Sequence, residues 1–435
     1  MGIKTLEFEN PILSGKLTIP GDKSISHRAV MLGSIAKGKT SISGFLDGED
    51  CISTINIFRQ LGVSIEREGT KVTIDSPGML RWKTPTQVLY AGNSGTTARL
   101  LLGILAGSRI TSVLTGDESL SNRPMNRVTL PLRTMGASIT GEPDSNLLPL
   151  SITGGQLKAI DYTMPVASAQ VKSAILFAGL TAEGETSVSE TTVSRDHTER
   201  MLMQFGADLS KKGNTVRLKG GQLLHATDVV VPGDISSAAF FMAAVAMLER
   251  SSVSFKNVGL NPTRTGIIDV LKEMGAQVEI GEEKEPLGEP YGDVTITYGS
   301  LQGIEISGAI IPTLIDELPV IALLATQAQG TTIIKDAAEL RVKETDRIVA
   351  VTTELKKLGA DIEATDDGMI IHGPTALTGG SLASYGDHRL GMMAAIAALV
   401  TSGPIQIEDP SCIAISYPGF FDDLEKLAIS TNLKG

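Results

Sequence analysis

Two short patterns of apolar and polar residues recur along the chain and divide it into repeats. The first is an amphipathic stretch that ends in a hydrophobic residue, a glycine and then Ala or Val, followed by a strand-like run. Its five copies, 69 to 84 residues apart, are centred on Gly62, Gly136, Gly206, Gly275 and Gly359. This pattern predicts an outer helix in each repeat, closed by a glycine in the left-handed conformation, and a strand after it.

The second pattern is a polar turn followed at once by an Ala-rich, almost wholly apolar segment, which predicts a buried helix. Its six starts, 65 to 79 residues apart, are Gly21, Gly92, Ser168, Gly233, Pro312 and Gly386. Each repeat is therefore expected to contain a buried helix, a strand, an outer helix and one or two further strands. Such a repeat is too small to bury its own apolar face, so repeats must cluster.

Six repeats in two clusters of three predict two lobes. The sixth repeat lacks its final strands, and the strand-like N-terminal residues 4–20 are expected to complete its lobe. The predicted division is residues 1–21 plus 234–435 for one lobe and residues 22–233 for the other. The chain would cross between lobes near Gly21 and Gly233, and two crossings predict a hinge.

Composition narrows the class of protein. Of 435 residues, 42% are hydrophobic and 20% charged, as in ordinary globular chains. The net charge of −11 repels nucleic acid, and 4% aromatic residues offer no stacking platform for single strands. Cys51, Cys412 and the five histidines lack the spacing of a disulfide framework or a metal site. This spacing predicts a protein without a metal. No signal peptide or membrane-spanning run stands out, so we expect the protein to be cytoplasmic.

Cations gather near the six polar turns, although the whole chain is acidic. Each turn leads into a helix N-terminus, whose free N–H groups and dipole favour anions. The cations near these starts are Lys23, Arg28, Arg99, Arg123, Lys172, Arg195, Lys343, Arg347 and Arg389. Any one of these could be a solvated ion pair, but together they predict a cationic cleft for small anionic substrates.

One nucleotide-binding motif is rejected on its context. Residues 33–40, GSIAKGKT, match the phosphate-loop pattern. A phosphate loop follows a strand and opens a helix, whereas here Gly38 ends a predicted helix and precedes a predicted strand. We expect the GKT segment to be a turn.

Three side chains leave two interpretations open. Asp316 lies at the edge of an apolar stretch, where partial burial suits it to accept a proton; alternatively it caps a helix. Glu344 lies beside Lys343 and three residues before Arg347, either next to a bound anion or in a surface ion-pair ladder. His388 begins a repeat, either as a ligand residue or in a local hydrogen bond.

Eight segments together resemble the 5-enolpyruvylshikimate-3-phosphate synthase family. They are GDKSISHRA, AGNSGTTARLL, LTGDESLSNRPM, ASAQVKSA, SRDHTERM, IDELPV, RVKETDRI and YGDHRLGM, and the resemblance extends from Gly21 to Phe421. It implies an α/β fold, a two-lobed inside-out barrel of six βαβαββ units, three per lobe, with helices inside and strands outside. It also implies a cytoplasmic monomer of the shikimate pathway, the target of glyphosate, that needs no cofactor.

The implied reaction transfers the enolpyruvyl group of phosphoenolpyruvate to the 5-hydroxyl of shikimate 3-phosphate through a tetrahedral intermediate and releases phosphate. The residues that resemble shikimate 3-phosphate ligands are Lys23, Ser24, Arg28, Ser168, Gln170, Arg195, Asp316 and Lys343. Those that resemble phosphoenolpyruvate ligands are Lys23, Asn93, Gly95, Arg123, Gln170, Arg347, His388 and Arg389. The implied catalytic residues are Asp316, as acceptor of the hydroxyl proton, Glu344, as proton donor to the methylene carbon, and Lys23.

One departure and two alternatives accompany the resemblance. Ile415 stands where many members have a lysine, which removes one cation that would bind phosphoenolpyruvate or glyphosate. The related transferase acting on UDP-N-acetylglucosamine usually has a reactive cysteine in the loop that here reads TGDESLSNR and contains none. A noncatalytic phosphate-ligand binding protein would not need both Asp316 and Glu344.

Overall fold

The computed structural model describes residues 2–141, 146–285 and 288–429. The chain divides into two compact units: residues 1–20, 232–285 and 290–435 form unit 1, and residues 21–231 and 286–289 form unit 2. The short segment 286–289 departs from the predicted division, which assigned all of residues 234–435 to one lobe. The reason is local, because Oε1 of Glu289 lies 2.7 Å from Nδ1 of His197 and the carbonyl of Gly288 accepts a hydrogen bond from Arg200.

Five of the six sheets derive from one βαβαββ order, and the sixth has one strand fewer. The clearest copy, in unit 2, runs β6 (Leu89–Tyr90), α3 (Gly95–Ala106), β7 (Thr111–Thr115), α5 (Asn126–Thr134), β8 (Ser138–Gly141) and β9 (Leu150–Thr153). Its sheet has the order β6-β7-β9-β8, with the first pair parallel and the others antiparallel. The parallel pair needs a crossover, and the buried helix supplies it.

Unit 2 contains two further copies. One comprises β14 (Val229–Val230), α1 (Lys23–Ile35), β3 (Lys37–Ser43), α2 (Glu49–Gln60), β4 (Ser64–Glu68) and β5 (Lys71–Pro77). The other comprises β10 (Asp161–Thr163), α6 (Ala169–Gly179), β11 (Glu185–Ser189), α7 (His197–Gln204), β12 (Leu209–Lys212) and β13 (Thr215–Lys219). In the copy that contains α1, the opening strand β14 therefore comes from the C-terminal end of the unit's sequence, whereas its other elements come from the N-terminal end.

Unit 1 repeats this arrangement three times. The first copy has β2 (Ile12–Thr18), α8 (Ile235–Met247), β15 (Ser252–Gly259), α9 (Gly266–Met274), β16 (Gln277–Ile280) and β17 (Tyr291–Thr297). The second has β18 (Glu305–Ile306), α11 (Leu318–Ala325), β19 (Gly330–Ile334), α12 (Arg347–Lys357), β20 (Asp361–Ala364) and β21 (Met369–Gly373). The third has β22 (Leu377–Ala383), α13 (His388–Ala397), β23 (Thr401–Glu408), α14 (Phe420–Leu427) and β1 (Ile3–Leu6).

Both N-terminal strands belong to unit 1. β1 pairs antiparallel with β23, while β2 pairs parallel with β15 and antiparallel with β24 (Ala428–Ile429). The short elements outside the repeats are η1 (Met79–Arg81), α4 (Glu118–Ser121), η2 (Gly308–Ile310), α10 (Ile311–Leu314), η3 (Ala338–Val342) and η4 (Pro410–Ile415).

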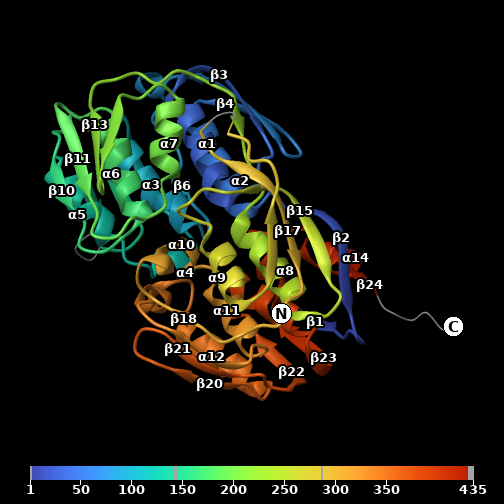
Figure 1. Ribbon diagram of the computed structural model, residues 1–435. Helices are drawn as coiled ribbons and strands as arrows, with labels where there is room; N and C mark the ends of the chain where they lie inside the picture. Colours follow the sequence, from blue (N-terminus) through green and yellow to red (C-terminus); the bar gives the residue numbers. More distant parts are fainter. Residues whose placement is uncertain (1, 142–145, 286–287, 430–435) are drawn as a thin grey trace. The chain divides into compact units, whose positions relative to one another are not determined.

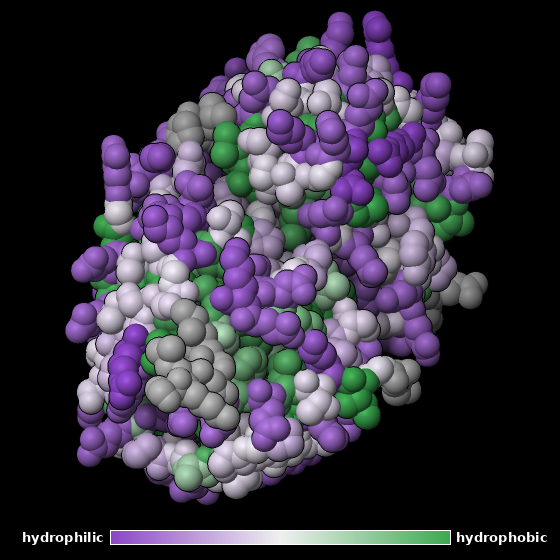
Figure 2. All heavy atoms as spheres, turned by 90° about the vertical axis from the view of Figure 1, so that its right-hand side faces the viewer, coloured by the Kyte–Doolittle hydropathy of each residue, from purple (hydrophilic) through white to green (hydrophobic). Residues whose placement is uncertain are grey.

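The apolar helices predicted from the second pattern form the core of each unit. In unit 2, α3 contacts both α1 and α6; in unit 1, α8, α11 and α13 contact one another. Sheets lie on their outer side, as β10, β11 and β13 do relative to α6 (Figure 1). The face drawn in Figure 2 is mostly hydrophilic, with apolar side chains in small separate patches. The inside-out α/β fold and its six repeats are thus confirmed.

The glycines of the first pattern also adopt the predicted conformation. All five have φ between 85° and 108°, in the left-handed region where a Cβ would be strained. Each lets the outer helix end and the chain turn directly into the next strand. Gly275 shows how such a helix end is hydrogen-bonded, since its N–H donates to the carbonyl of Lys272.

The segment from Pro312 differs from the single helix that its pattern predicts. It forms two helical pieces, Gly308–Leu314 and Leu318–Ala325, bent by 111° at the residues between them. Pro319 explains the second start, because a proline without an N–H is tolerated only in the first turn of a helix. Glu317, and not Asp316, is the N-cap of α11, and its side chain makes no capping bond.

The phosphate-loop match is excluded as predicted, because residues 33–40 begin inside the last turn of α1 and end in β3, so the motif does not open a helix. The GKT residues lie in β3 and not in a turn. Among the described residues, no single helix is long and apolar enough to span a membrane. The two helical pieces on either side of Asp316 together have the length and composition of a span, but they are sharply bent.

Candidate active site

Side-chain caps mark the starts of the buried helices. Asp or Ser stands one residue before the helix, and its oxygen accepts a backbone N–H from the first turn. The capping residues are Asp22 of α1, Ser94 of α3, Ser168 of α6, Asp234 of α8 and Asp387 of α13. The polar turns of the sequence pattern are therefore cap positions. Several sequence-predicted ligand residues lie at or near these starts, where the remaining free N–H groups favour anions: Lys23, Ser24, Asn93, Gly95, Ser168, Gln170, His388 and Arg389.

At the start of α1, Lys23, Ser24 and Arg28 lie together. The ammonium of Lys23 is 2.5 Å from Oδ2 of Asp50 on α2. The buried guanidinium of Arg28 donates from Nη1 to the Ser24 carbonyl (2.9 Å). It also donates to Oγ1 of Thr198 (2.6 Å) and Oγ of Ser173 (3.0 Å). Burial lowers the pKa of Arg28 to about 10, so it remains a cation at neutral pH.

At the start of α3, the structure brings Asn93, Gly95 and Arg123 together. Nη2 of Arg123 donates to Oδ1 of Asn93 (2.7 Å), and Nδ2 of Asn93 donates to Oδ2 of Asp117 (2.7 Å). Asp117 in turn caps α4, with Oδ1 accepting the N–H of Leu120. The amide of Asn93 thereby orients the guanidinium beside the helix N-terminus.

Arg99, which the predicted ligand set omits, completes this cluster. Its Nη1 donates to Oε1 of Gln170 (2.8 Å), and Nε2 of Gln170 donates to Oγ1 of Thr96 (3.1 Å). A Cβ on Gly95 would lie 2.9 Å from Nη1 of Arg99 and 3.6 Å from Nη1 of Arg123. The bare backbone of Gly95 is thus flanked by two guanidinium groups. The spacing of four residues from Gly95, which puts Arg99 on the same helix face, was the available signal.

The other predicted cations of unit 2 separate into two kinds. Arg195 is half-buried between β11 and α7, and its charge contributes to lowering the pKa of Arg28. Lys172, by contrast, is fully buried, with Nζ 2.7 Å from a carboxylate oxygen of Glu190 and of Glu199. Burial opposes its charge, but the two carboxylates raise the pKa of Lys172. The prediction that Lys172 lines a cationic cleft was wrong, because its ammonium is buried in ion pairs with two carboxylates.

A Lys172→Met variant is expected to destabilise unit 2 by about 3–5 kcal/mol, since two buried carboxylates lose their cation. The single tryptophan, Trp82, reports on this unit, because it lies in its core with its ring 5.4 Å from Phe58. Urea unfolding followed by tryptophan fluorescence measures the change. The exposed Lys211→Met is the control, expected within about 0.5 kcal/mol of the parent. An unchanged midpoint for Lys172→Met would contradict the structural role.

In unit 1, Arg347 is the centre of a cluster of carboxylates. It is the first residue of α12 and is buried. Its guanidinium donates to Asp387 from Nε (2.7 Å) and Nη2 (3.2 Å), to Oδ1 of Asp316 (3.1 Å) and to Oε2 of Glu344 (2.8 Å). Nζ of Lys343 lies 3.7 Å from the same oxygen of Asp316. Burial would lower the pKa of Arg347, but the three carboxylates raise it above its ordinary value.

This geometry excludes two of the interpretations left open by the sequence, the helix cap for Asp316 and the surface ladder for Glu344. Asp316 is not a helix cap; its carboxylate lies between the side chains of Lys343 and Arg347. Glu344 does form an ion pair at i, i+3 spacing, but with a buried Arg347, so the pair is not a surface ladder. Asp387, absent from the predicted set, binds Arg347 bidentately. Its position before the predicted buried helix was the signal that would have found it.

The first two residues of α13 are His388 and Arg389, both buried. Nη1 of Arg389 donates to the carbonyl of Ser236 (2.9 Å), and its guanidinium lies 5.8 Å from the ring centre of Phe240. Ile415 ends η4 and packs half-buried against the apolar core of unit 1. Ile415 is therefore part of an apolar surface.

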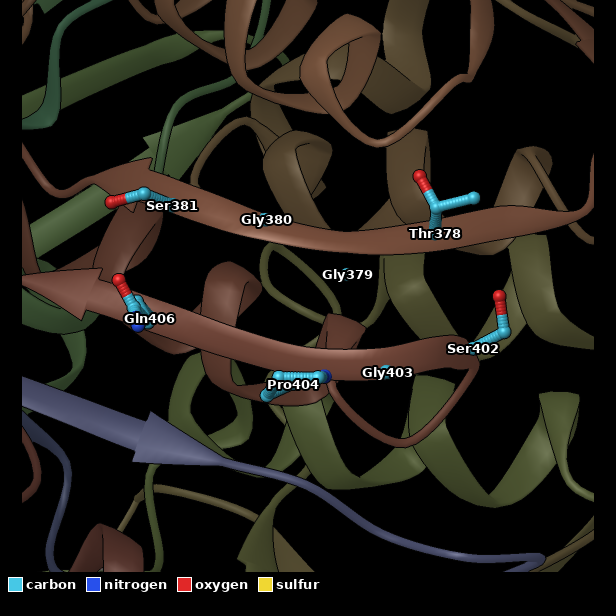
Figure 3. A pocket seen from close by; sticks show the side chains of 8 residues that line it. All are labelled: Thr378, Gly379, Gly380, Ser381, Ser402, Gly403, Pro404 and Gln406. Atoms are coloured by element: carbon cyan, nitrogen blue, oxygen red, sulfur yellow. The ribbon is translucent and has the colours of Figure 1, made fainter.

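Other features of the described residues offer less chemistry. A shallow groove over β22 and β23 is lined by Thr, Ser, Gly, Pro and Gln and contains no titratable side chain (Figure 3). The described residues contain no group of three or more His, Cys, Asp or Glu side chains that could hold a metal. Both cysteines are buried, and burial raises the pKa of the Cys412 thiol to about 11.

Solved structures place this fold in the class of the enolpyruvyl transferases. The enolpyruvyl transferase NikO from Streptomyces tendae matches 98% of this chain and 97% of its own with a TM-score of 0.79, at 19% identity. A structure of EPSP synthase from Acinetobacter baumannii matches 98% of both chains with a TM-score of 0.89, at 47% identity.

Sequence comparison identifies the family. The model of EPSP synthase (3-phosphoshikimate 1-carboxyvinyltransferase) matches residues 9–424, so the chain belongs to the EPSP synthase family. A relative from Bacillus pumilus named 3-phosphoshikimate 1-carboxyvinyltransferase is 60% identical over 95% of this chain and 97% of its own. One of the same name from Shouchella clausii is 59% identical over 98% and 99%. The family resemblance drawn from the eight segments is confirmed.

Proposed function

We propose that this protein is an enzyme that transfers the enolpyruvyl group of phosphoenolpyruvate to the 5-hydroxyl of shikimate 3-phosphate and releases phosphate. The observation that carries this conclusion is the family match over residues 9–424, supported by relatives named 3-phosphoshikimate 1-carboxyvinyltransferase at 59–60% identity. The cations at the helix starts of both units suit substrates that are small anions. The transferase acting on UDP-N-acetylglucosamine is not favoured, because the loop around α4 has no cysteine.

Unit 2 would supply most of the substrate ligands. Shikimate 3-phosphate would meet Lys23, Ser24, Arg28, Ser168, Gln170 and Arg195. Phosphoenolpyruvate would meet Lys23, Gln170, Asn93, Gly95 and Arg123. The bare backbone of Gly95 between two guanidinium groups supports the second set, because an anion can approach the helix N-terminus closely there. We add Arg99 to it, on the strength of its position beside Gly95.

Unit 1 would supply the proton transfers. Asp316, which lies between the side chains of Lys343 and Arg347, accepts the proton of the 5-hydroxyl as that oxygen attacks the enol carbon. Glu344 delivers a proton to the methylene carbon, which becomes a methyl group in the tetrahedral adduct. Phosphate then leaves with the proton that Asp316 accepted, Glu344 takes a proton back from the methyl group, and the enol ether is restored. Arg347, His388 and Arg389 would hold phosphoenolpyruvate and stabilise its charge.

The remaining assignments follow from the same family. The two structural units are proposed to be the two functional lobes, with hinge crossings near Gly21 and Gly233. The protein is proposed to act in the cytoplasm as a monomer and to use no cofactor. Glyphosate would occupy the phosphoenolpyruvate position, with Ile415 removing one cation from its surroundings.

A phosphate-release assay tests the function. Release is expected with shikimate 3-phosphate and phosphoenolpyruvate together, and with neither alone. Mass spectrometry of the product should show the enolpyruvyl ether. Release with UDP-N-acetylglucosamine in place of shikimate 3-phosphate would contradict the proposal, and so would binding of both substrates without turnover.

A Gly95→Ala variant is expected to raise the KM for phosphoenolpyruvate about tenfold, which corresponds to about 1.4 kcal/mol of binding free energy. The added methyl would lie 2.9 Å from the flexible end of Arg99, so the fold tolerates it while the anion loses its space. Steady-state kinetics with each substrate varied in turn measure the effect. Gly155→Ala is the matched control, because its Cβ would meet nothing within 4 Å. Equal changes in both variants would contradict the assignment.

A further inference from the structure

His27 is a buried histidine for which the proposed chemistry has no use. It lies on α1, one turn after Lys23, and has no exposed surface. Burial is the main cause that lowers the pKa of His27 to about 3, and four nearby charges partly oppose one another: Asp50, Lys23, Arg28 and Asp22. At neutral pH the ring is therefore uncharged and carries a single proton.

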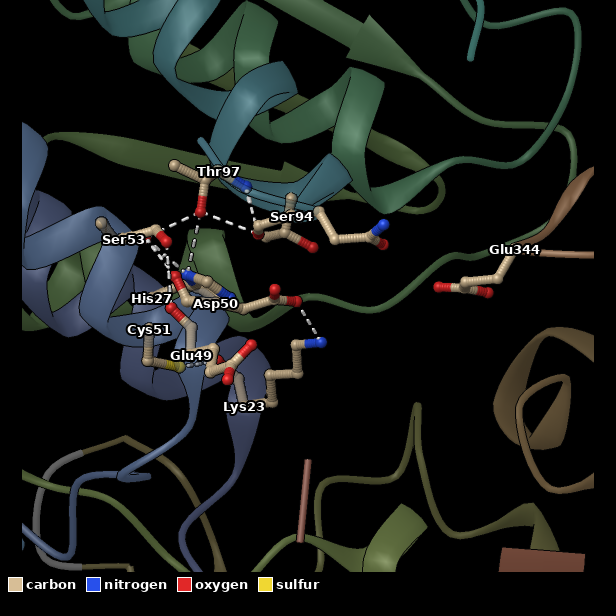
Figure 4. Close-up of polar contacts among 12 residues, drawn as sticks. Lys23, His27, Glu49, Asp50, Cys51, Ser53, Ser94, Thr97 and Glu344 are labelled. Atoms are coloured by element: carbon tan, nitrogen blue, oxygen red, sulfur yellow. Dashed lines mark hydrogen bonds and ion pairs between the residues drawn. The ribbon is translucent and has the colours of Figure 1, made fainter. Parts of the chain in front are cut away.

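Three hydroxyl groups connect the His27 ring with the start of α3 (Figure 4). Nδ1 of His27 lies 2.8 Å from Oγ1 of Thr54 on α2, and that oxygen lies 2.8 Å from Oγ1 of Thr97 on α3. Oγ1 of Thr97 donates to Oγ of Ser94 (2.8 Å), the residue that caps α3. All four side chains are buried. The chain of contacts therefore joins three helices inside unit 2.

Counting protons gives this chain a direction. The Thr97 hydroxyl proton goes to Ser94, so the proton in the contact between Thr54 and Thr97 comes from Thr54. The other acceptor near the Thr54 hydroxyl, the Asp50 carbonyl, is more distant at 3.3 Å. The contact between Thr54 and His27 then uses a proton on Nδ1, an atom that also lies 3.4 Å from Oγ1 of Thr97. Nε2 of His27 has no hydrogen-bond partner among the described residues, and an N–H there would be a buried donor left unsatisfied.

We propose that His27 is a positioning residue whose Nδ1–H donates into a hydrogen-bond chain through Thr54 and Thr97 to Ser94, and so holds the start of α3 against α1. These two helix starts carry Lys23 and Gly95. Ser94 accepts both the N–H and the hydroxyl of Thr97, so breaking the chain loosens the cap that orients the first turn of α3.

The kinetic consequence rests on the proposed function, which assigns the start of α3 to phosphoenolpyruvate and the start of α1 to both substrates. In the proposed function the proton-transferring carboxylates belong to unit 1, whereas this chain of hydroxyl groups belongs to unit 2. Interrupting the chain should therefore weaken phosphoenolpyruvate binding and leave the chemical step nearly unchanged. A merely structural role would instead lower stability and change kcat and both KM values together.

The tautomer of His27 tests the inference without any turnover. In protein labelled with ¹⁵N-histidine, long-range ¹H–¹⁵N spectra resolve the five rings, and a His27→Asn variant identifies the signal of His27. We expect an Nδ1–H ring whose shifts stay constant from pH 5 to pH 9. An Nε2–H ring, or a ring that titrates in this range, overturns the proposal.

Kinetics of matched variants test the positioning role. Thr54→Val keeps the shape of the side chain but interrupts the chain, and we expect it to raise the KM for phosphoenolpyruvate about tenfold. His27→Ala should do the same, with kcat within about threefold of the parent, whereas His27→Asn, which retains a donor near Nδ1, should restore KM to within about twofold. The exposed His225→Asn is the control and should change neither parameter.

The outcomes separate this inference from the proposed function. An unchanged KM in Thr54→Val overturns the positioning role, because that variant removes the hydroxyl with little change in shape. A parent protein that shows the Nδ1–H ring but no phosphate release supports the hydrogen-bond chain and contradicts the proposed function. Far-UV circular dichroism of each variant confirms that the kinetics refer to folded protein.

Discussion

An Asp316→Asn variant is expected to lose about a thousandfold in kcat, within the range that general base catalysis contributes. The amide keeps the shape of the side chain and cannot take the proton of the attacking hydroxyl. Arg347 still pairs with Asp387 and Glu344, so unit 1 should remain folded. Single-turnover phosphate release with both substrates at saturation measures the chemical step directly.

The control for this prediction is Asp361→Asn on β20, an exposed carboxylate of the same unit. It should leave kcat within about twofold of the parent, as an isolated surface substitution does. Two results would argue against the role of Asp316. One is a thousandfold loss that appears only in KM, which would make it a binding residue, and the other is a variant that no longer folds.

An Arg347→Met variant is expected to destabilise unit 1 by about 3–5 kcal/mol, because it leaves three carboxylates without their common cation. Asp387 contributes most to this cost, since its side chain is fully buried, whereas those of Asp316 and Glu344 are partly exposed. Any folded variant should also bind phosphoenolpyruvate more weakly. Urea unfolding followed by circular dichroism measures the loss of stability.

Trp82 makes the prediction specific to one unit. Its fluorescence reports on unit 2, so Arg347→Met should shift the circular dichroism transition more than the fluorescence transition. Lys172→Met should shift the fluorescence transition. Arg347→Lys separates charge from shape, because one ammonium cannot replace a guanidinium that binds Asp387 bidentately. If Arg347→Met unfolds at the same urea concentration as the parent, the carboxylates do not depend on this cation.

The repeats could be predicted because short sequence patterns determine where the helices and strands of each repeat begin and end. A left-handed glycine after an amphipathic helix and a polar cap before an apolar helix act within a few residues, so the six units and their element order follow from the sequence. The break before Leu318 was missed because every residue from Ile310 to Ile315 except Thr313 is apolar or proline, which hides a bend in a continuous hydrophobic run. Pro319 was the visible signal.

The candidate site was predictable at its helix starts and less so beyond them. Lys23, Asn93, Gly95 and Arg347 stand at or beside cap positions, which the pattern reveals. The contacts that set their charges do not follow from local pattern, because Asp387 lies 40 residues after Arg347 and Glu190 lies 18 after Lys172. For the same reason a buried structural lysine and a ligand lysine look alike in the sequence.

The pairing of β1 with β23 has a consequence for how the chain is made. Residues 3–6 are synthesised long before their partners, residues 405–408. Unit 2 is almost continuous in sequence and can collapse during translation. In unit 1, β1 remains unpaired until β23 has been synthesised. Such long-range closure is slow. Chaperone demand and aggregation during expression should therefore trace to unit 1, and extra residues fused ahead of Ile3 would act at its last step of assembly.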